Sequence, residues 1–281
     1  MDTYRTEFAL CERDSPPALL DDLWTTLRRE GIEAAERDSL MAQPISQALL
    51  RHASFAEALS ARLSSKLADA DVPKQALGAL IADTLAHSPA ALHAAAVDLM
   101  AVQERDPACP DLVTPFLYFK GFLAIQAFRV SHVLWHEGRL HLARHLQARI
   151  SEVFAMDIHP AARLGCGIMI DHGTGVVIGE TAVVEDNVSI LQDVTLGGTG
   201  KECGDRHPKI RRGVLLGAGA KVLGNIEVGE GAKVGAGSIV LEDVAAYTTV
   251  VGVPARPIGA RLTDVPAFTM DQMIEQPDYV I

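Results

Sequence analysis

The sequence predicts an α+β protein in three consecutive parts: an all-helical domain over residues 1–154, a parallel β-helix over residues 155–257, and a flexible tail over residues 258–281. Three observations carry this prediction. Apolar residues recur at helical spacing in the first part, at a fixed six-residue spacing in the second, and with neither period in the third. The chain of 281 residues, 48% of them hydrophobic, can bury a sizeable core.

Leucines that return every three or four residues indicate the helical part, as in residues 19–27 and again in residues 59–67. Two helix starts are marked by a side-chain oxygen followed by proline, at Ser88-Pro89 and Thr114-Pro115, because proline at the first helical position loses no hydrogen bond. The stretch after Pro115 is expected to form one or two longer helices, with a break at Gly138.

The second part repeats an aliphatic residue every six positions. A strand has a period of two and a helix a period of 3.6, so neither explains this pattern. A fixed six-residue repeat is the signature of a parallel β-helix, in which each turn buries its inward side chains against the turns above and below. The thirteen repeat positions all hold isoleucine, leucine or valine: Ile158, Leu164, Ile170, Ile178, Val184, Ile190, Leu196, Ile210, Leu216, Val222, Val228, Val234 and Val240.

Six-residue units of this kind resemble those of the hexapeptide-repeat acyltransferases. The resemblance implies a left-handed β-helix of triangular cross-section with three units per turn, although parallel crossovers are generally right-handed. It also implies a trimer, with active sites between neighbouring subunits.

Two insertions interrupt the repeat, and insertions at the corners of a solenoid tend to carry function. One adds two residues in "IDHGTGVV" (170–177). The other, "GGTGKECGDRHPK" (197–209), leaves the repeat until Ile210, holds no aliphatic residue and is expected to project from the prism. Either stretch could be only a solvated loop, so the side chains that they carry decide their interpretation.

Composition argues against several functional classes. The formal net charge is −11 and the isoelectric point about 5.3, so the chain lacks the basic excess that nucleic-acid binding requires. Acidic residues near the N-terminus, and Lys120 within the most apolar later stretch, argue against a signal peptide and a membrane span, so we expect a cytoplasmic protein. The four cysteines are widely spaced and form no C-x-x-C pair, which favours free thiols over a disulfide framework.

His172 is the candidate catalytic residue, because an imidazole can accept a proton near neutral pH and return it later. A histidine at a turn can equally be a hydrogen-bonded structural residue, and a base needs a partner that fixes its tautomer. Asp157 precedes His172 by fifteen residues, close to one eighteen-residue turn of the coil. We therefore expect the Asp157 carboxylate to reach the ring of His172.

The stretch "DIHPAARLGCGIMIDHGTGVVIGETAVVEDNVSILQDVTLGGTGKECGDRHPKI" (157–210) resembles the serine O-acetyltransferases nearly residue for residue. The resemblance extends upstream through "RDPACPDLVTPFLYFKGFLAIQAFR" (105–129) and downstream through "GAGAKVLGNIEVGEGAKVGAGS" and "VVGVPAR" (250–256). "DHGTG" stands where the family commonly has Asp-His-Ala-Thr-Gly, which leaves the acid and the base in place. Residues 1–90 resemble the family only in being helical and alanine-rich.

This resemblance implies roles for the residues at the matching positions. It implies that His172 takes the proton of the L-serine hydroxyl, whose oxygen attacks the thioester of the co-substrate acetyl-CoA, and that Asp157 holds the imidazole. It places Asp106 and Asp171 on the serine ammonium. The expected contacts to the serine carboxylate are Arg206 and His207, and the expected contacts to CoA are Gly198, Ala218, Ala236 and, near the phosphates, Lys233. No metal is expected.

Other functional classes stay open from the residues alone. Some hexapeptide prisms are carbonic anhydrases that bind zinc through three histidines across a trimer seam, and His159, His172 and His207 offer such a set. The chain could also be a non-catalytic scaffold, or an acyltransferase for a sugar or an antibiotic. The helical half and the "DRHP" motif speak against these, since the sugar-specific relatives resemble this chain only in the repeat.

The resemblance also implies control and partners. The family is typically inhibited by L-cysteine, which differs from serine only in its thiol and is expected to use the same ammonium and carboxylate contacts. Homo-trimers are expected to pair into a dimer of trimers. In the family a C-terminal isoleucine enters the active site of O-acetylserine sulfhydrylase, and this chain ends at Ile281, so we expect that enzyme as a partner.

Overall fold

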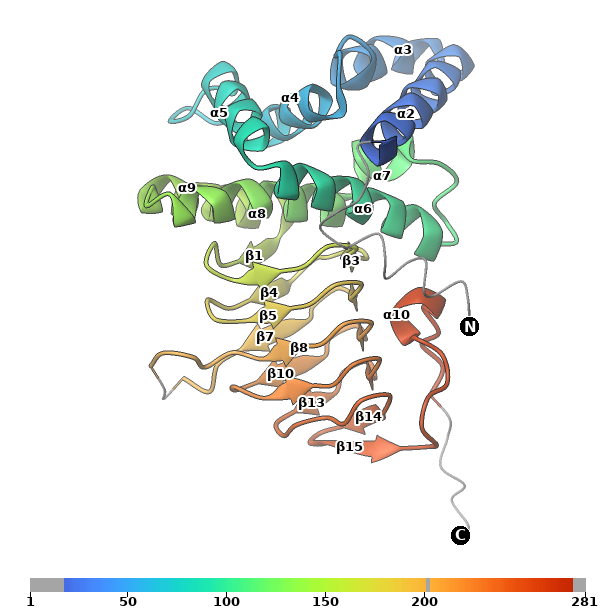
Figure 1. The fold of residues 1–281 in the computed structure, drawn as a ribbon, viewed down its shortest axis with the longest axis vertical. Coiled ribbons are helices and arrows are strands. Elements are labelled where there is room, and N and C mark those ends of the chain that lie inside the picture. Colours follow the sequence, from blue (N-terminus) through green and yellow to red (C-terminus); the bar gives the residue numbers. More distant parts are fainter. Residues whose placement is uncertain (1–17, 201–202, 275–281) are drawn as a thin grey trace.

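The computed structural model describes residues 18–200 and 203–274, and every structural statement below refers to these residues. Figure 1 shows two layers of helices stacked on one end of a column of short strands. The expected helical region followed by a parallel β-helix of six-residue repeats is confirmed. The left hand of the coil stays a prediction from the resemblance.

The helices begin and end largely where the sequence signals place them. Pro89 opens α6 and Gly138, with φ +79°, separates α8 from α9, as expected. Thr114 is not an N-cap, because α7 begins one residue earlier and the Asp111 carboxylate accepts the Thr114 N–H at 2.7 Å. The helices are α2 (Ala18–Arg37), α3 (Ser39–Ile45), the π-helical turn η1 (Ser46–Leu50), α4 (Phe55–Leu67), α5 (Lys74–His87), α6 (Pro89–Arg105), α7 (Val113–Tyr118), α8 (Lys120–His136) and α9 (Leu140–Phe154).

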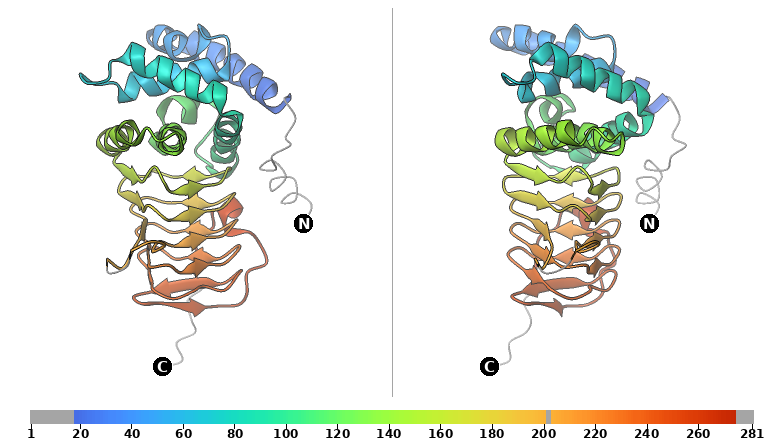
Figure 2. Two further views of the ribbon diagram at one scale, coloured as in Figure 1. Left: turned by 60° about the vertical axis from the view of Figure 1, so that its left-hand side comes forward. Right: turned by 90° about the vertical axis from the view of Figure 1, so that its left-hand side faces the viewer.

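Three parallel sheets form the faces of the prism, and Figure 2 shows their strands stacked turn upon turn. Sheet A contains β1 (Met156–Ile158), β4 (Val176–Ile178), β7 (Thr195–Gly197), β10 (Lys221–Leu223) and β13 (Ile239–Val240). Sheet B contains β2 (Arg163–Leu164), β5 (Val183–Val184), β8 (Lys209–Ile210) and β11 (Glu227–Val228). Sheet C contains β3 (Met169–Ile170), β6 (Ser189–Ile190), β9 (Leu215–Leu216), β12 (Lys233–Val234), β14 (Thr249–Gly252) and the antiparallel β15 (Ala255–Ile258).

The register of the strands follows the insertions seen in the sequence. An uninterrupted turn takes eighteen residues, as between Val177 and Thr195. The two-residue insertion lengthens the first turn to twenty, so Asp157 pairs with Val177. The loop over residues 197–209 lengthens its turn to twenty-six, so Thr195 pairs with Lys221, and the following turn to Ile239 returns to eighteen. The insertions are therefore accommodated at single corners, without disturbing the ladders.

The repeat positions form the interior of the prism. Twelve of the thirteen aliphatic side chains are buried, at most 4% exposed, and only Leu164 is partly exposed. Identical positions on successive turns stack on one another, as Ile178, Leu196 and Val222 do along sheet A. Each buried aliphatic side chain contributes about 1.5–3 kcal/mol relative to exposure, so the stack is the main source of stability of this region.

Buried charges fix the helical region on the first turn of the prism. Asp98 on α6 is fully buried, and its Oδ2 accepts hydrogen bonds from Nε and Nη2 of Arg129 on α8 at 3.0 and 2.7 Å. Its Oδ1 accepts the backbone N–H of Ile168 at 2.9 Å, and Arg129 Nη2 also donates to the Gly165 carbonyl at 2.7 Å. Because removal of one partner of such a buried pair costs about 3–5 kcal/mol, this network holds α6 and α8 in place on the prism.

The described part of the expected flexible tail packs on the prism instead. Residues 266–269 form the short helix α10 (Pro266–Thr269), in which Pro266 and Ala267 are buried. The Ala267 carbonyl accepts a hydrogen bond from Ser189 Oγ at 2.8 Å, and the ring of Phe268 lies 4.7 Å from the guanidinium carbon of Arg105. Apolar and aromatic side chains give this segment a surface to bury, which the absence of a repeat did not reveal.

Two further expectations concern thiols and membranes. Cys109 and Cys203 are free thiols, but Cys166 is disulfide-bonded, so the expectation of free thiols throughout is wrong for Cys166; Cys11 lies outside the described residues. Within the described ranges no single helix has the length and apolar character to cross a membrane, and only the sharply bent pair α5 and α6 passes that test jointly.

Candidate active site

His172 lies at the corner that completes the first turn of the prism, where the chain passes from β3 of sheet C into β4 of sheet A. We call residues 171–175 the His172 corner. The His172 backbone has φ +56°, a left-handed conformation that non-glycine residues rarely adopt and that is often found at functional sites. The Gly173 N–H closes the turn on the Asp171 carbonyl at 2.6 Å. The His172 side chain is 72% exposed, so its imidazole is open to a substrate.

The helical region supports this corner from above. Helix α8 approaches the prism so closely at Gly121 that an added Cβ would lie 2.0 Å from the Ile170 carbonyl oxygen. The preceding residue, Lys120, donates a hydrogen bond to the hydroxyl of Thr174 in the His172 corner. The close approach of glycine to the backbone therefore lets α8 carry an ammonium group to the turn beside His172.

Two carboxylates meet beside His172. Asp106 stands at the C-terminal end of α6, where its Oδ1 accepts the Ala108 N–H at 2.8 Å, and Asp171 follows β3, against which α6 packs. Asp171 Oδ2 lies 3.7 Å from His172 Nε2. Burial raises the pKa of Asp171, His172 opposes the rise, and the Asp106 carboxylate adds to it. Two neighbouring carboxylates, one of them half-buried, favour a cation such as an ammonium between them.

The turn that contains Asp157 and His172 is longer than the spacing argument assumed. The first turn has twenty residues rather than eighteen, so Asp157 stands opposite Val177 on β4, and His172 lies in the corner before that strand. Asp157 Oδ1 accepts a hydrogen bond from Gln147 Nε2 at 2.7 Å. Among the described residues no hydrogen bond joins Asp157 to His172, whose ring lies instead beside Asp171. The pairing of Asp157 with His172 therefore stays a prediction from the family.

Arg206 and His207 lie together at another corner of the prism. The chain turns there from sheet A into sheet B. The last residues of the projecting loop, 206–208, lie beside residues 179–182 of the preceding turn. We call these two segments the His207 corner. Arg206 Nη2 donates to Glu180 Oε2 at 2.7 Å, and the Arg206 guanidinium is the main cause that lowers the pKa of Glu180. His207 is only 7% exposed and its Nδ1 lies 2.8 Å from Thr181 Oγ1. This corner therefore presents a fixed cation beside a buried imidazole.

The two corners lie at opposite edges of sheet A. Strand β4 begins just after the His172 corner and ends just before Gly179, the first residue of the His207 corner. At about 3.3 Å per residue, the strand and its flanking residues separate the two groups by far more than the length of an amino acid. One chain therefore brings His172 together with Asp106 and Asp171, and separately brings Arg206 together with His207, but it does not unite the two sets.

The expected CoA residues divide in the same way. Ala218 and Ala236 lie on the edge of sheets C and A below His172, where the Gly237 N–H donates to the Ala218 carbonyl at 2.8 Å. Gly198 follows β7 and belongs to the opposite edge, beside Arg206. Lys233 lies with neither, because it is on sheet C, 7% exposed, and its ammonium donates to the Met273 carbonyl. Lys233 is thus covered by the C-terminal segment and lies on neither of these two edges.

Sequence reasoning missed the residues that hold the expected ones. Lys120, Gly179, Glu180 and Thr181 all contact candidate site residues or their turns. The only available signal was "GET" directly after the insertion-bearing turn, where polar residues replace the small residues usual at a corner. That signal does not reveal its partners, since they lie twenty-six residues away along the chain, beyond the projecting loop.

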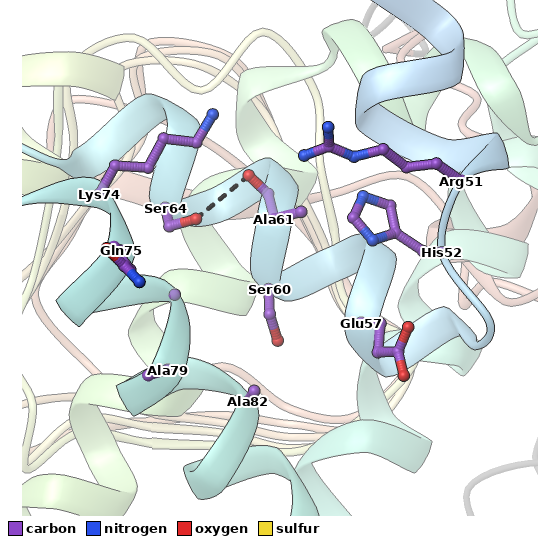
Figure 3. Close-up of a pocket in the computed structure, with 11 residues that line it drawn as sticks. Arg51, His52, Glu57, Ser60, Ala61, Ser64, Lys74, Gln75, Ala79 and Ala82 are labelled. Carbon is purple, nitrogen blue, oxygen red and sulfur yellow. Dashed lines mark hydrogen bonds between the residues drawn. The ribbon is translucent and has the colours of Figure 1, made fainter.

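A separate cavity lies in the helical region and holds none of the expected site residues. It has a volume of about 480 Å³, lies between η1, α4 and α5, and has a floor of small residues. Figure 3 shows Arg51 and Lys74 pointing toward each other across it. As for the zinc alternative, no three His, Cys, Asp or Glu side chains within residues 18–200 and 203–274 are grouped to hold a metal ion.

Comparison with known proteins adds the family to this geometry. A family model described as "Serine acetyltransferase, N-terminal" matches residues 23–127, and one for the bacterial transferase hexapeptide repeat matches residues 207–242. The chain is 51% identical over 253 residues to a serine acetyltransferase of Salmonella typhimurium, which covers 90% of this chain and 93% of the relative. The chain belongs to the serine acetyltransferase family. The first 90 residues resemble the family in sequence only in being helical and alanine-rich, yet most of them lie within the match to the N-terminal family model.

Solved structures of serine acetyltransferases have the same fold. The Vibrio cholerae structure has a TM-score of 0.89 at 52% identity, covering 91% of this chain and 99% of that one. A serine acetyltransferase solved in complex with cysteine has a TM-score of 0.88 at 50% identity, covering 90% and 98%. The Brucella abortus serine acetyltransferase in complex with coenzyme A has a TM-score of 0.84 at 49% identity, covering 87% and 98%.

Proposed function

We propose that this protein transfers the acetyl group of acetyl-CoA to the hydroxyl of L-serine, as acetyl-CoA:L-serine O-acetyltransferase. The observation that carries the proposal is the exposed imidazole of His172 beside the paired carboxylates of Asp106 and Asp171. A base next to an ammonium site is what acylation of an amino-acid hydroxyl requires. The direct test is release of the CoA thiol from acetyl-CoA with L-serine as the acceptor; absence of serine-dependent release would refute the proposal.

His172 acts as the general base in this proposal. Its unprotonated ring nitrogen accepts the serine hydroxyl proton while the serine oxygen forms a bond to the thioester carbonyl carbon. The carbon–sulfur bond then breaks, and the imidazolium returns the proton to the departing CoA thiolate. Asp171, at 3.7 Å, stabilises the imidazolium formed in between. The family role of Asp157 is to orient the imidazole; Gln147 donates to its Oδ1, and its second oxygen would be the one that contacts the ring.

The amino-acid substrate is held at both of its charged groups. Its ammonium lies between Asp106 and Asp171, which offsets the burial and, to a smaller extent, the repulsion by Asp106 that raise the pKa of Asp171. Its carboxylate binds Arg206, whose guanidinium offers a planar set of donors, and His207. Since these two pairs lie at opposite edges of sheet A, the proposal requires the His172 corner of one chain to face the His207 corner of another.

A homo-trimer satisfies this requirement, because rotation about a threefold axis brings the same two edges together at every interface. We propose such trimers, paired into a dimer of trimers. Acetyl-CoA would lie in the groove at each interface, along Ala218 and Ala236 of one chain and Gly198 of the next. The serine acetyltransferase of Brucella abortus solved with coenzyme A supports a CoA site in this fold.

Mixed trimers test the shared site. His172→Ala chains and Arg206→Ala chains, each nearly inactive alone at low serine concentration, are co-expressed with different tags and purified as mixed assemblies. In every mixed trimer one of the three interfaces then combines an intact His172 with an intact Arg206, so about a third of the wild-type activity should return. A site contained in one chain predicts no recovery.

We further propose that L-cysteine inhibits the enzyme in the serine site. The complex of a related serine acetyltransferase with cysteine supports this, and the thiol of cysteine leaves its ammonium and carboxylate free to make the serine contacts. Inhibition should be competitive with serine, and Asp106→Ala should relieve it. Inhibition that saturating serine cannot overcome would exclude a shared site.

The proposed protein partner is O-acetylserine sulfhydrylase, in the cytoplasm, bound through the C-terminal Ile281. This residue lies outside the described residues, so the proposal depends on the family resemblance and on the free carboxylate of an apolar terminus. A peptide of the last ten residues should bind the sulfhydrylase, and deletion of Ile281 should abolish the complex without lowering acetyltransferase activity. Equal binding by the full chain and the deletion would remove the tail as the docking element.

A further inference from the structure

The ring of His207 is held by a single residue, Thr181, through both its backbone and its side chain. The Thr181 backbone N–H donates to His207 Nδ1 at 3.2 Å, and Thr181 Oγ1 lies 2.8 Å from the same nitrogen. Thr181 Oγ1 also accepts the backbone N–H groups of Arg206 at 3.0 Å and of His207 at 3.1 Å. One threonine therefore fixes the main chain and the imidazole of this corner together.

These contacts determine which ring nitrogen carries the proton. A backbone N–H can only donate, so Nδ1 facing the Thr181 N–H must be the unprotonated acceptor. A hydroxyl oxygen has two lone pairs, and both are taken by the N–H groups of Arg206 and His207. The Thr181 hydroxyl can then meet Nδ1 only as a donor. Both contacts assign the remaining ring proton to Nε2, and a second proton at Nδ1 would have no acceptor.

We propose that Thr181 is a positioning residue that keeps His207 neutral with its proton on Nε2, so that His207 donates this N–H to the carboxylate of the amino-acid substrate. The inference rests on the proposed function for the identity of the ligand, but the tautomer follows from the contacts alone. Among the described residues, no hydrogen-bond partner takes Nε2, which leaves this N–H for a ligand.

The neighbours of the ring support a neutral imidazole. Burial lowers the pKa of His207, and the positive charges of Arg206 and Lys209 lower it further, as does His159; Glu180 opposes them. The Asp205 carboxylate, which is paired with Lys209, also receives a hydrogen bond from the Thr181 side chain and so competes with Nδ1 for the hydroxyl proton. The Thr181 backbone N–H is therefore the contact that fixes the tautomer by itself. The net effect keeps the ring neutral below its ordinary pKa of about 6.5, so the proton on Nε2 persists through neutral pH.

Gly179 completes the arrangement by leaving space for the ring. A Cβ added at Gly179 would lie 2.0 Å from His207 Cδ2 and 2.1 Å from Nε2, so the imidazole packs directly over the glycine. The consecutive residues Gly179, Glu180 and Thr181 thus supply space for the ring, an anion for the Arg206 guanidinium, and the donors at Nδ1.

This assignment gives the two histidines of the site different chemistry. His207 has its only ring lone pair occupied at Nδ1, so it cannot accept the proton of the substrate hydroxyl. His172 makes no such contact and remains able to accept one. His207 therefore belongs to recognition of the carboxylate, beside the charge of Arg206, and the base function falls to His172 alone.

The kinetic test compares three variants. Thr181→Val removes the hydroxyl at constant shape and should raise KM for serine about tenfold while changing kcat and KM for acetyl-CoA less than about twofold. Thr181→Ser keeps the hydroxyl and should restore the wild-type KM for serine. Thr248→Val is the matched control, because the exposed Thr248 hydroxyl contacts only the Ala246 carbonyl, at 3.4 Å, on a later turn. Equal KM values for Thr181→Val and wild type would overturn the positioning role.

A spectroscopic test on the unaltered protein does not depend on the folding of any variant. Histidine labelled with nitrogen-15 in the ring, with the His207 signals assigned by loss in His207→Gln, reports the protonation of each nitrogen directly. We expect unprotonated Nδ1 and protonated Nε2 at and somewhat below neutral pH. A proton on Nδ1 at neutral pH, as the other tautomer or as imidazolium, would overturn the inference.

The two tests separate this inference from the proposed function. If Arg206→Ala and His207→Ala raise KM for serine but Thr181→Val does not, the role of Thr181 is refuted while the serine site stands. If none of the three raises KM for serine, the proposed carboxylate contact is refuted, and the spectra still decide the tautomer of His207.

Discussion

The two corners of the prism hold their histidines in opposite ways. His172 is 72% exposed, adopts a left-handed backbone conformation, and has one acidic group 3.7 Å from its ring. His207 is 7% exposed, and Thr181 contacts its ring and its main chain. The difference shows that the chain fixes the His207 ring by itself and leaves the His172 ring exposed.

The largest expected effect comes from removing the open imidazole. His172→Ala should lower kcat by about 10²–10⁴-fold, because it removes the imidazole proposed to accept the serine proton, and it should leave the thermal unfolding temperature and the assembly intact. Steady-state kinetics and size-exclusion chromatography measure both. His87→Ala is the matched control, since His87 on α5 is 74% exposed and should be replaceable without effect. Wild-type turnover in His172→Ala would remove the mechanism.

The same substitution at two glycines sharpens the contrast between the corners. Gly179→Ala places a methyl group 2.0 Å from the His207 ring, which Thr181 prevents from moving, so KM for serine should rise about tenfold or more. Gly173→Ala meets the flexible end of Met156, 2.3 Å from its Cε, and adds about 1 kcal/mol of backbone strain at φ +71°. Its effect should be a lower unfolding temperature with a nearly unchanged KM.

A similar KM for the two alanine variants would contradict this contrast, because it would mean that both corners tolerate a methyl group equally. Differential scanning calorimetry and serine titrations on the two proteins, prepared in parallel, provide the comparison. The alanine that the family commonly has at position 173 is consistent with the milder outcome expected there.

The smallest expected effect concerns the charge beside the open corner. Burial and Asp106 raise the pKa of Asp171, so its contribution to stability is present at low pH and is lost as the pH rises through the raised pKa. Asp106→Asn keeps an oxygen for the Ala108 N–H but removes the repulsion. The unfolding temperature should therefore rise by about 1 °C at neutral pH, whereas KM for serine should increase.

This difference in unfolding temperature should vanish in acid, where Asp171 is protonated in both proteins. A difference that persists at low pH would show that it does not arise from repulsion between the two carboxylates. Thermal scans of the wild type and Asp106→Asn over a series of pH values measure it.

The sequence predicted the scaffold better than the contacts on it. The six-residue period identifies the inward side chains, and the lengths of the two insertions give the twenty-residue and twenty-six-residue turns that the strand register contains. Inward positions are predictable because the core accepts only aliphatic side chains there. The contacts of corner residues are not predictable in this way. An outward polar residue such as Thr181 contacts a residue on the far side of an insertion, and the insertion has no sequence repeat from which its course could be predicted.

Two of the expected site residues have surroundings that the repeat does not predict. The first turn contains twenty residues rather than eighteen, so Asp157 lies opposite Val177 with its carboxylate bound by Gln147, and its pairing with His172 stays a prediction. Lys233 is expected near the CoA phosphates, and the segment after the last repeat packs over it and accepts its hydrogen bond at the Met273 carbonyl. Both residues point outward, and outward surroundings depend on segments that the repeat does not govern.

The loop between β7 and β8 adds eight residues to one turn, and the next turn resumes its normal length with every ladder intact. The pairing of strands between successive turns is thus kept even where the number of residues in a turn changes. A change in the length or composition of such a loop alters only the loop and does not shift the strands in the turns above or below it. A loop for a different carboxylate ligand could therefore evolve, or be engineered, between β7 and β8 while the rest of the β-helix stays unchanged.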